Sequence, residues 1–462
     1  MPESTAASRL GTEPVGRLLL RFSVPAITGM IVNALYNVVD RIWVGRGVNE
    51  IALGSLSLVM PLMTITMAFA MLFGVGSANL ISMRLGQGRK EDAENALNHC
   101  FFLLVISALI IMTVELIFLD RILGYMGAKE GSTALGYAHR YYQIILYGQV
   151  FFMTGFGFSH CTRAQGFPGI TMIGMIIGAG LNMILDPLFI LVFGWGVEGA
   201  AWATIISQFV SMVWIIYFNF GKKAVIHLNF RRFHLSGRTI TDIMSFGSSQ
   251  FLLQFAMSTV QLLINQSLGW YGEAALGPNG DVIALSGLNI TMSVGMLFFM
   301  PIFGINQGVQ PILGFNYGAR HFDRVRRAFL LAISGATMIC LVGFSLGELF
   351  PHALVRLFAP NGSPSLLRFG PITLRVVMMT MPLNGFTIVA TNFFVVTGRP
   401  RTSIFLSMLR QVIALIPCIL IFGKIWGLWG VIAAIPVADS FAFICTGTMI
   451  LLELRKLKET QH

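Results

Sequence analysis

The chain has 462 residues, of which 55% are hydrophobic and 11% are charged, and its mean hydropathy is +0.76. Soluble globular proteins contain about 25% charged residues, so this composition excludes a soluble domain and predicts a polytopic membrane protein. The net charge of +11 could indicate a nucleic-acid-binding protein. The basic residues lie in short loops between apolar segments, however, and we expect no nucleic-acid partner.

The N-terminal segment and the cysteines carry no further targeting or metal signal. Residues 1–17 are polar, and no small-residue cleavage motif follows the first apolar segment, so we interpret that segment as a membrane span. The five cysteines show no CxxC or other metal-type spacing, which is typical of free, packed thiols. We expect no cofactor.

Twelve apolar segments are long enough to cross a membrane, because a spanning helix needs about 20 mostly apolar residues. They cover roughly residues 16–42, 51–80, 96–119, 137–160, 168–193, 197–220, 241–269, 282–311, 328–352, 370–396, 403–423 and 428–453. Pro25 interrupts the first segment, with Gly29 one turn later, and Pro187 interrupts the fifth. Proline inside a span frees a backbone carbonyl and lets the helix bend. The sequence therefore predicts an all-α fold of twelve transmembrane helices.

Lys and Arg residues predict the orientation of these helices. If the N-terminus is inside, most of the 31 Lys and Arg residues fall on the inner side, as the positive-inside rule requires. We expect a multi-pass protein of the cell (inner or plasma) membrane with both termini in the cytoplasm. The basic loop Lys222–Arg238 is interpreted as a topology anchor rather than a nucleic-acid patch, because it contains few aromatic residues and joins two spans.

The chain also repeats itself. Ile51–Met60 resembles Ile283–Met292, and the same offset of 232 residues relates Gly76 to Gly308. Six helices per half give both halves one orientation, so a pseudo-two-fold axis along the membrane normal is expected, as in transporters that work by alternating access. The predicted parts are an N-terminal six-helix bundle (1–221), a cytoplasmic linker loop (222–239) and a C-terminal six-helix bundle (240–462).

Two acidic residues lie within predicted spans of the N-terminal half. Asp186 follows Asn182 by four residues, so both project from one helix face. A carboxylate at such depth costs about 2.5–3.5 kcal/mol and should face a partner or a cavity. If Asp40 lies nearby, the pair resists double ionisation and can exchange a proton, or hold Na⁺ with Asn182 and Thr204. Alternatively, Asp186 caps a broken helix and Asp40 pairs with Arg41.

The repeat does not preserve these acids, since the counterpart of Asp186 is Cys418. Titratable chemistry is therefore predicted in the N-terminal half alone. Glu115 lies near the predicted outer boundary and is interpreted as an interfacial acid. Asp439 is nearer the middle of the twelfth segment, and both helix packing and function stay open for it.

One motif suggests an enzyme. Gly343–Gly347 matches GxSxG, but a nucleophile elbow needs a strand before it. The match falls inside the ninth apolar segment, and no histidine lies deep in another span to serve as its base. We interpret the motif as chance in a glycine-rich helix and expect no enzyme activity.

Over residues 10–455 the chain resembles the multidrug and toxic compound extrusion (MATE) family, and it is most similar to the prokaryotic DinF-like and MepA-like branches. The resemblance rests on the six-plus-six layout and on Pro25, Tyr36, Asp40, Tyr141, Asn182-x-x-x-Asp186-Pro187, Trp195–Thr204 and Thr204. It implies a V-shaped pair of bundles that exports cationic or amphipathic drugs against inward H⁺ or Na⁺. It also implies a cation site of Asp40, Asn182, Asp186 and Thr204, lined by Tyr36 and Tyr141.

The NorM-like branch of that family places acids on its seventh and eighth helices. Here those helices offer amides such as Asn265 but no acid in the middle of the span, so that coupling scheme does not carry over. Substrate is expected between the halves, in contact with the first, second, seventh and eighth helices. Candidate cavity residues are Asn33, Asn37, Ser159, Met175, Gln250, Gln254 and Gln261.

The expected partners are small cationic or amphipathic drugs and the lipid bilayer, and nothing in the sequence demands more than a monomer. The alternative function is a flippase of the same superfold for lipid-linked oligosaccharides or peptidoglycan precursors. Such proteins carry Arg residues in the central cavity to hold a diphosphate. Arg is not expected in the middle of the spans here, which favours the drug exporter.

Overall fold

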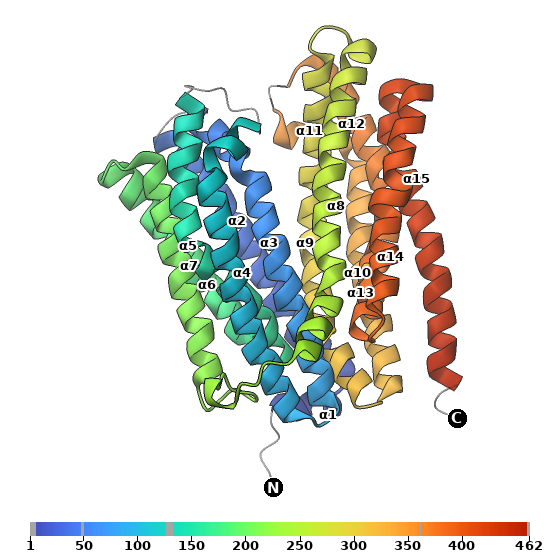
Figure 1. The fold of residues 1–462 in the computed structure, drawn as a ribbon. Helices are drawn as coiled ribbons and strands as arrows, with labels where there is room; N and C mark the ends of the chain where they lie inside the picture. Colours follow the sequence, from blue (N-terminus) through green and yellow to red (C-terminus); the bar gives the residue numbers. More distant parts are fainter. Residues whose placement is uncertain (1–5, 48–49, 126–132, 361, 460–462) are drawn as a thin grey trace. The chain divides into compact units, whose positions relative to one another are not determined.

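The computed structural model describes residues 6–47, 50–125, 133–360 and 362–459, and every regular element in these ranges is a helix (Figure 1). The first half of the chain forms α1 (Ala6–Thr12), α2 (Val15–Gly47), α3 (Glu50–Gly86), α4 (Lys90–Tyr125), α5 (Thr133–Ala164), α6 (Pro168–Pro187), η1 (Leu188–Val192) and α7 (Gly196–Phe220). The second half follows η2 (Phe230–Arg232) with α8 (Gly237–Leu276), α9 (Gly280–Gly318), α10 (Phe322–Leu349), α11 (Pro351–Phe358), α12 (Pro364–Met378), α13 (Met381–Val396), α14 (Pro400–Met408), η3 (Leu409–Leu415) and α15 (Ile416–Glu459). The predicted all-α fold is confirmed.

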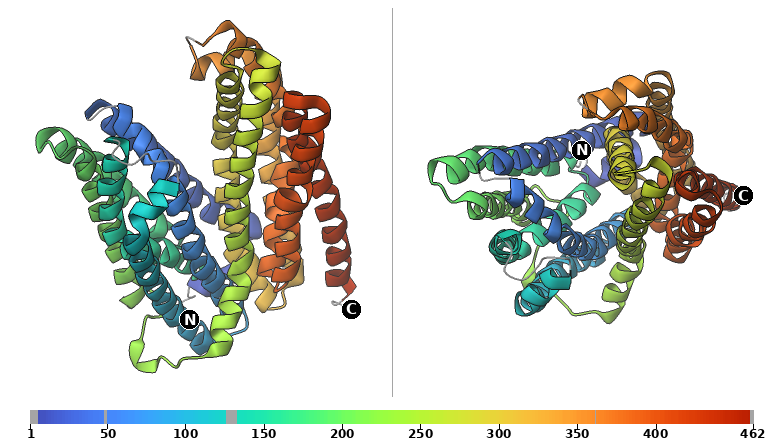
Figure 2. Two further views of the ribbon diagram at one scale, coloured as in Figure 1. Left: turned by 45° about the horizontal axis from the view of Figure 1, so that its top comes forward. Right: turned by 90° about the horizontal axis from the view of Figure 1, so that it is seen from above.

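Nine helices among the described residues are long and apolar enough to cross a membrane, or ten if the bent pair α12 and α13 is one span. The helical stretch Pro400–Arg455 counts once in that number although it has 56 residues. A straight helix of that length would measure about 84 Å, far more than the ~30 Å hydrocarbon core. It contains two spans, because Gly427 has a φ of 59° and interrupts the helix (Figure 2). Together with the long, amide-rich α8, this gives the twelve predicted helices.

Several spans depart from regular α-helix. A π-helix, η1, follows Asp186 and Pro187, and a longer π-helix, η3, forms the middle of the eleventh span. Helices α12 and α13 meet at a 43° bend. Helix α2, in contrast, runs without a break through Pro25. Because π-helical segments occur frequently at functional sites, η1 and η3 mark two places of interest.

The structure divides into two compact units. The first unit contains Met1–Pro14, Val24–Phe251 and Gly314–Arg320, and the second contains Val15–Ser23, Leu252–Leu313 and His321–His462. Helices α2, α8 and α9 therefore contribute residues to both units. The two six-helix domains and the linker predicted from the sequence stay a prediction.

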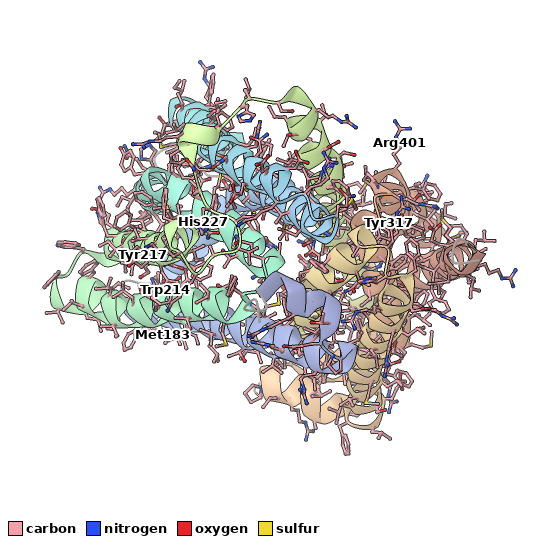
Figure 3. The ribbon with its side chains drawn as sticks, turned by 90° about the horizontal axis from the view of Figure 1, so that it is seen from below. Met183, Trp214, Tyr217, His227, Tyr317 and Arg401 are labelled. Atoms are coloured by element: carbon pink, nitrogen blue, oxygen red, sulfur yellow. The ribbon has the colours of Figure 1, made fainter. Side chains whose placement is uncertain are left out.

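Helices α6 and α7 pack along one another within the first unit, and this pairing positions the site described below. Trp214 Nε1 donates to the carbonyl oxygen of Ile170 at 3.1 Å, and Ser211 Oγ donates to that of Gly174 at 2.9 Å. Figure 3 shows α6 and α7 side by side, with Met183 on α6. The pairing brings the polar end of α6 against the beginning of α7.

The loop after α7, interpreted above as a linker, is docked on the first unit. Ala224, Ile226 and Leu228 are buried, although Lys222 and Lys223 before them are exposed. Asn98 on α4 exchanges two hydrogen bonds with the backbone of Asn229, and Ser236 N–H donates to His99 Nε2 at 3.0 Å. His227 belongs to the same loop (Figure 3). The loop thus holds the chain against α4 up to the start of α8.

The repeated glycines make similar close contacts in each unit. A side chain at Gly76 would collide with the backbone of Ile243 and Gly247 on α8, and one at Gly308 on α9 would collide with Ser23 on α2. Both positions thus need glycine, because a neighbouring helix lies directly against their backbone. The offset seen in the sequence therefore corresponds to equivalent helix crossings.

Candidate functional site

Four helices of the first unit bring polar side chains to one place. Helix α2 contributes two of them, α5 one, α6 two and α7 one: they are Tyr36, Asp40, Tyr141, Asn182, Asp186 and Thr204. The last four are at most 6% exposed. The structure therefore brings together all six residues that the sequence and the resemblance suggested for a cation site.

Asn182 connects the two sides of this cluster. Its Nδ2 donates to Asp186 Oδ1 at 3.1 Å, as the spacing of four residues predicts, and lies 3.4 Å from Thr204 Oγ1. The phenol groups of Tyr36 and Tyr141 each hydrogen-bond with Thr204. Thr204 is therefore the point at which α2, α5, α6 and α7 meet.

Asp40 and Asp186 are neighbours, close enough for their charges to interact. An ionised carboxylate can only accept hydrogen bonds, so two carboxyl groups bond to each other only when one of them carries a proton. No N–H or hydroxyl group of the described residues donates to Asp186 Oδ2. The contact between the two acids is therefore one that a single proton completes.

The negative charge of Asp186 also calls for a bound proton or another cation. Asp186 is fully buried, and no basic side chain forms an ion pair with it among the described residues. A buried charge is normally paired or neutralised. The oxygens that converge here come from carboxyl, amide and hydroxyl groups, and Asn182 Oδ1 is buried without a donor. Such oxygens suit H⁺ or a hard cation such as Na⁺.

In the alternative interpretation, Asp186 caps a broken helix and Asp40 pairs with Arg41. Helix α6 does not break at Asp186 but continues through Pro187 into η1. The side chain of Arg41, the alternative partner of Asp40, lies outside the described residues. Asp186 therefore serves the cluster of four helices rather than a free helix end.

The other candidates on the first six spans are more scattered. Gly29 lies against Met175, since a side chain at Gly29 would come within 2.5 Å of Met175 Sδ. Ser159 is buried, and its Oγ donates to the carbonyl oxygen of Phe156 at 2.6 Å. Asn33 is exposed on α2, and the side chain of Asn37 lies outside the described residues. The structure brings none of these into the cluster around Asp186.

The three glutamines proposed for the cavity all lie on α8. Gln250 and Gln254 are half-buried, whereas Gln261 is exposed and donates to Asn265 Oδ1 at 2.9 Å. Gln250 belongs to the first unit and the other two belong to the second. Their role in substrate binding stays a prediction.

A second buried charge cluster lies in the second unit, around Asp439 on α15. Arg410 Nε donates to Asp439 Oδ1 at 2.7 Å. Thr380 Oγ1 and Asn384 Nδ2 donate to Asp439 Oδ2 at 3.1 and 2.8 Å. Arg410 belongs to η3, and Thr380 lies at the bend between α12 and α13. One carboxylate therefore ties together three spans, two of them irregular.

This cluster corrects one prediction from the sequence, because the middle of the spans does contain an arginine. The prediction that titratable chemistry is confined to the N-terminal half stays a prediction, since Asp439 has a fixed partner in Arg410. Arg410 lies ten residues beyond Pro400, where α14 begins, which is about 15 Å along a helix. The sequence feature that could have predicted this ion pair is the presence of Arg410 and Asp439 inside apolar segments. Charged residues of opposite sign in such segments usually pair within the bundle.

Glu115 is buried within the protein. Its side chain is 5% exposed, and Tyr142 Oη donates to Glu115 Oε2 at 3.0 Å. The predicted segment ends at residue 119, whereas α4 continues to Tyr125. The interpretation of Glu115 as an interfacial acid concerns its depth in the membrane and stays a prediction.

Comparison with known proteins places this architecture in a family. A family model described as MatE matches residues 25–188 and 250–420 of the chain, which is more than half of its length. The chain belongs to the MATE family. The two matched segments correspond to the two repeated halves, so the family pattern occurs twice along the chain.

Several relatives align with almost the whole length of this chain. Multidrug export protein MepA of Staphylococcus aureus is 26% identical over 442 residues, which are 95% of this chain and 94% of that protein. A solved structure of MATE in the bent conformation is 29% identical, with a TM-score of 0.90 and 98% of both chains covered. The outward-facing conformation of a multidrug resistance MATE family transporter of the MOP superfamily is 29% identical, with a TM-score of 0.88 and the same coverage.

Membership in the MATE family agrees with the rest of the structure. The chain is a multi-pass membrane protein with the twelve-helix architecture of its solved relatives. The GxSxG match lies inside the regular helix α10, where no strand precedes it. Within the described ranges, no group of three or more His, Cys, Asp or Glu residues could hold a metal ion.

Proposed function

We propose that this protein exports small cationic or amphipathic drugs and is driven by inward movement of H⁺ or Na⁺ at the Asp40–Asp186 pair. The observation that carries this proposal is that, among the described residues, no basic side chain pairs with the buried Asp186. A fully buried carboxyl group with an acidic neighbour and without such a pair needs an exchangeable cation to be stable. The multidrug export proteins and multidrug resistance transporters among its relatives support drugs as the cargo.

The geometry suggests how ion binding is converted into movement. With a proton or Na⁺ bound, Asp40 on α2 and Asp186 on α6 attract a common cation; without it, the two carboxylates repel each other. Repulsion is strong where water is excluded. The helix that carries Asp40 is the one that contains Pro25, and a missing backbone donor makes bending cheap. Loss or gain of the cation would therefore change the bend of α2.

Ion and drug then compete through the protein rather than through direct contact. A ligand shifts a two-state equilibrium only by its differential affinity for the two states. If the cation favours one form of α2 and the drug favours the other, inward ion movement expels the drug. The ion would be H⁺ or Na⁺, because the same carboxyl, amide and hydroxyl oxygens serve both.

The flippase alternative is less well supported. Arg410 is the arginine that could hold a diphosphate in the second unit, but its guanidinium already pairs with Asp439 at 2.7 Å. The pair is neutral, so it offers no net positive charge to an anionic lipid. We infer that the protein works as a monomeric exporter with both termini in the cytoplasm and with no cofactor besides the coupling ion.

Purified protein in liposomes tests the proposal. Efflux of a fluorescent cationic dye is measured under an imposed H⁺ gradient and, separately, an imposed Na⁺ gradient. We expect one of the two to drive efflux in the wild type, and Asp40→Asn to abolish that response. Glu273→Gln, which neutralises an exposed acid on α8, is the matched control. Efflux by Asp40→Asn at the wild-type rate would place the coupling site elsewhere.

A further inference from the structure

A second buried acid lies in the first unit, apart from the Asp40–Asp186 pair. Glu115 on α4 is 5% exposed, and its Oε2 lies 3.0 Å from the phenol oxygen of Tyr142 on α5. Tyr142 is itself 1% exposed. No ion pair of the described residues includes Glu115. Like Asp186, it is a buried carboxyl group that no basic side chain of the described ranges pairs with.

A chain of polar groups continues from Glu115 into the unit. The phenol of Tyr142 lies beside Thr66 on α3, close enough for the two hydroxyl groups to interact. Thr66 Oγ1 accepts from Gln149 Nε2 at 3.1 Å and donates to the carbonyl oxygen of Leu62 at 3.3 Å. Four buried side chains from three helices therefore form one connected network. Buried networks of this kind are costly unless every donor finds an acceptor.

The same network approaches the surface at the end of α4 and α5 that carries their connecting loop. His139, three residues before Tyr142, pairs with Asp120, five residues after Glu115, at 3.3 Å. The Asp120 side chain is 85% exposed. One helical turn separates His139 from Tyr142 on the same face of α5. An exposed titratable pair thus lies directly beyond the buried one.

Burial favours a proton on Glu115, because an ionised carboxylate away from water is costly unless other groups offset its charge. The phenol of Tyr142 donates to Glu115 Oε2 at 3.0 Å. This bond can persist after protonation, since the carboxyl oxygen without the proton still accepts. Thr66 keeps Gln149 as its donor and the carbonyl oxygen of Leu62 as its acceptor in both states. Proton binding therefore removes a buried charge without breaking the network.

We propose that Glu115 is a second proton-binding site of the first unit, reached from the loop end of α4 and α5 past Asp120 and His139. One O–H bond of hydronium breaks, which releases water, and one O–H bond forms on the carboxylate. Protonation of Glu115 affects the Asp40–Asp186 pair through α5, because Tyr142 contacts Glu115 and the adjacent Tyr141 belongs to the cluster around that pair. This last role rests on the proposed function, whereas proton binding itself does not.

Infrared difference spectroscopy of the full chain in lipid nanodiscs tests proton binding directly. Spectra recorded between alkaline and acidic buffer should show the carbonyl band of a newly protonated buried carboxylic acid. We expect Glu115→Gln to lose one such band, Glu115→Asp to retain it, and Tyr142→Phe to shift its frequency. An unchanged set of bands in Glu115→Gln, or a wild-type band that does not respond to pH, would overturn the proposal.

A second measurement separates this proposal from the proposed function. Protons released on drug addition are counted in weakly buffered detergent solution. We expect the count to fall by one in Glu115→Gln and to be unchanged in Glu115→Asp. Asp40→Asn, which removes coupling, should keep the infrared band of Glu115. Loss of that band in Asp40→Asn, or a Na⁺-dependent but pH-independent signal from Glu115, would contradict an independent proton site.

Discussion

Each unit buries a carboxylate among polar side chains of several of its spans, but the charge of that carboxylate is neutralised differently in the two units. Asp439 receives three donors that occupy both of its oxygens: the fixed cation Arg410 and the neutral side chains of Thr380 and Asn384. Asp186 receives one amide and a second acid, with no basic side chain among the described residues. One site is complete as folded and the other requires a mobile cation. The duplicated architecture therefore has one half that is equipped for exchange.

The repeat shows where this difference arises. The offset of 232 residues relates Arg410 to Gly178, and the offset of 231 that relates Trp195 to Trp426 relates Asp439 to Gln208. A Cβ atom at Gly178 would lie 3.3 Å from Ser211 Cβ, so α6 and α7 pack closely at this position. Neither counterpart of the ion pair carries a charge. The first unit instead carries its acids nearer to η1.

The largest expected effect comes from the Asp40–Asp186 site, which requires a mobile cation. Asp186→Asn replaces the carboxyl group by a neutral amide of the same shape, so the site no longer needs a cation and cannot exchange one. Gradient-driven export should be abolished, while thermal unfolding in detergent changes little. Dye efflux from liposomes measures the first and a melting curve the second. Export at more than a small fraction of the wild-type rate would show that Asp186 is not the coupling acid.

The complete site should respond in the opposite way. Arg410→Gln leaves Asp439 buried without its cation, and breaking such a pair costs about 3–5 kcal/mol of stability. The cost should shrink as the pH is lowered, because protonation removes the unpaired charge in the folded protein. Melting curves at several pH values measure both effects. The double variant Arg410→Gln with Asp439→Asn is the control and should recover most of the stability at neutral pH.

Asn182 in the first unit and Asn384 in the second each donate to a buried carboxylate, which allows a matched comparison of the two sites. Asn182→Ala removes the amide that donates to Asp186, and a hydrogen bond to a charged group contributes about 1.5–3 kcal/mol. The ion concentration for half-maximal transport should therefore rise about tenfold or more. Asn384→Ala removes the equivalent donor to Asp439 and should lower the melting temperature without changing that concentration. Equal effects on ion dependence would mean that both units exchange an ion.

Much of this architecture could be predicted from the sequence, because it depends on local spacing. The i, i+4 pair Asn182–Asp186, the twelve apolar segments and the repeated Gly76 and Gly308 are all properties of short stretches or of one offset. The ion pair of Arg410 and Asp439 joins residues 29 positions apart on different helices, and a single sequence does not show which helices meet.

Distant contacts account for the other differences. The predicted span ends at residue 119, whereas α4 extends six residues further, and the sequence does not show that Tyr142 covers Glu115. The π-helix η3 has no composition that separates it from an α-helix, so its position around Arg410 could not be foreseen. Docking of the loop after α7 depends on side chains of α4, such as Asn98, that are distant in sequence. These features follow from tertiary packing, which overrides local preference.

The smallest expected effect concerns the helix that carries Asp40. Helix α2 lacks one intrahelical hydrogen bond at Pro25, and Pro25→Ala restores it, which favours the unbent form by about 0.5–1.5 kcal/mol. This should slow turnover about two- to tenfold, since each 1.36 kcal/mol changes a rate tenfold, while drug affinity stays nearly constant. Stopped-flow efflux and equilibrium dye binding separate the two.

Pro301→Ala is the matched control, because Pro301 also lies inside a span, α9, but that helix contributes no contact to Asp439. If bending of α2 affects transport because it moves Asp40, Pro301→Ala should leave the ion dependence of transport unchanged. Equal slowing by both variants would mean that proline acts on general helix flexibility, and the coupling assigned to α2 would then have no special link to Asp40.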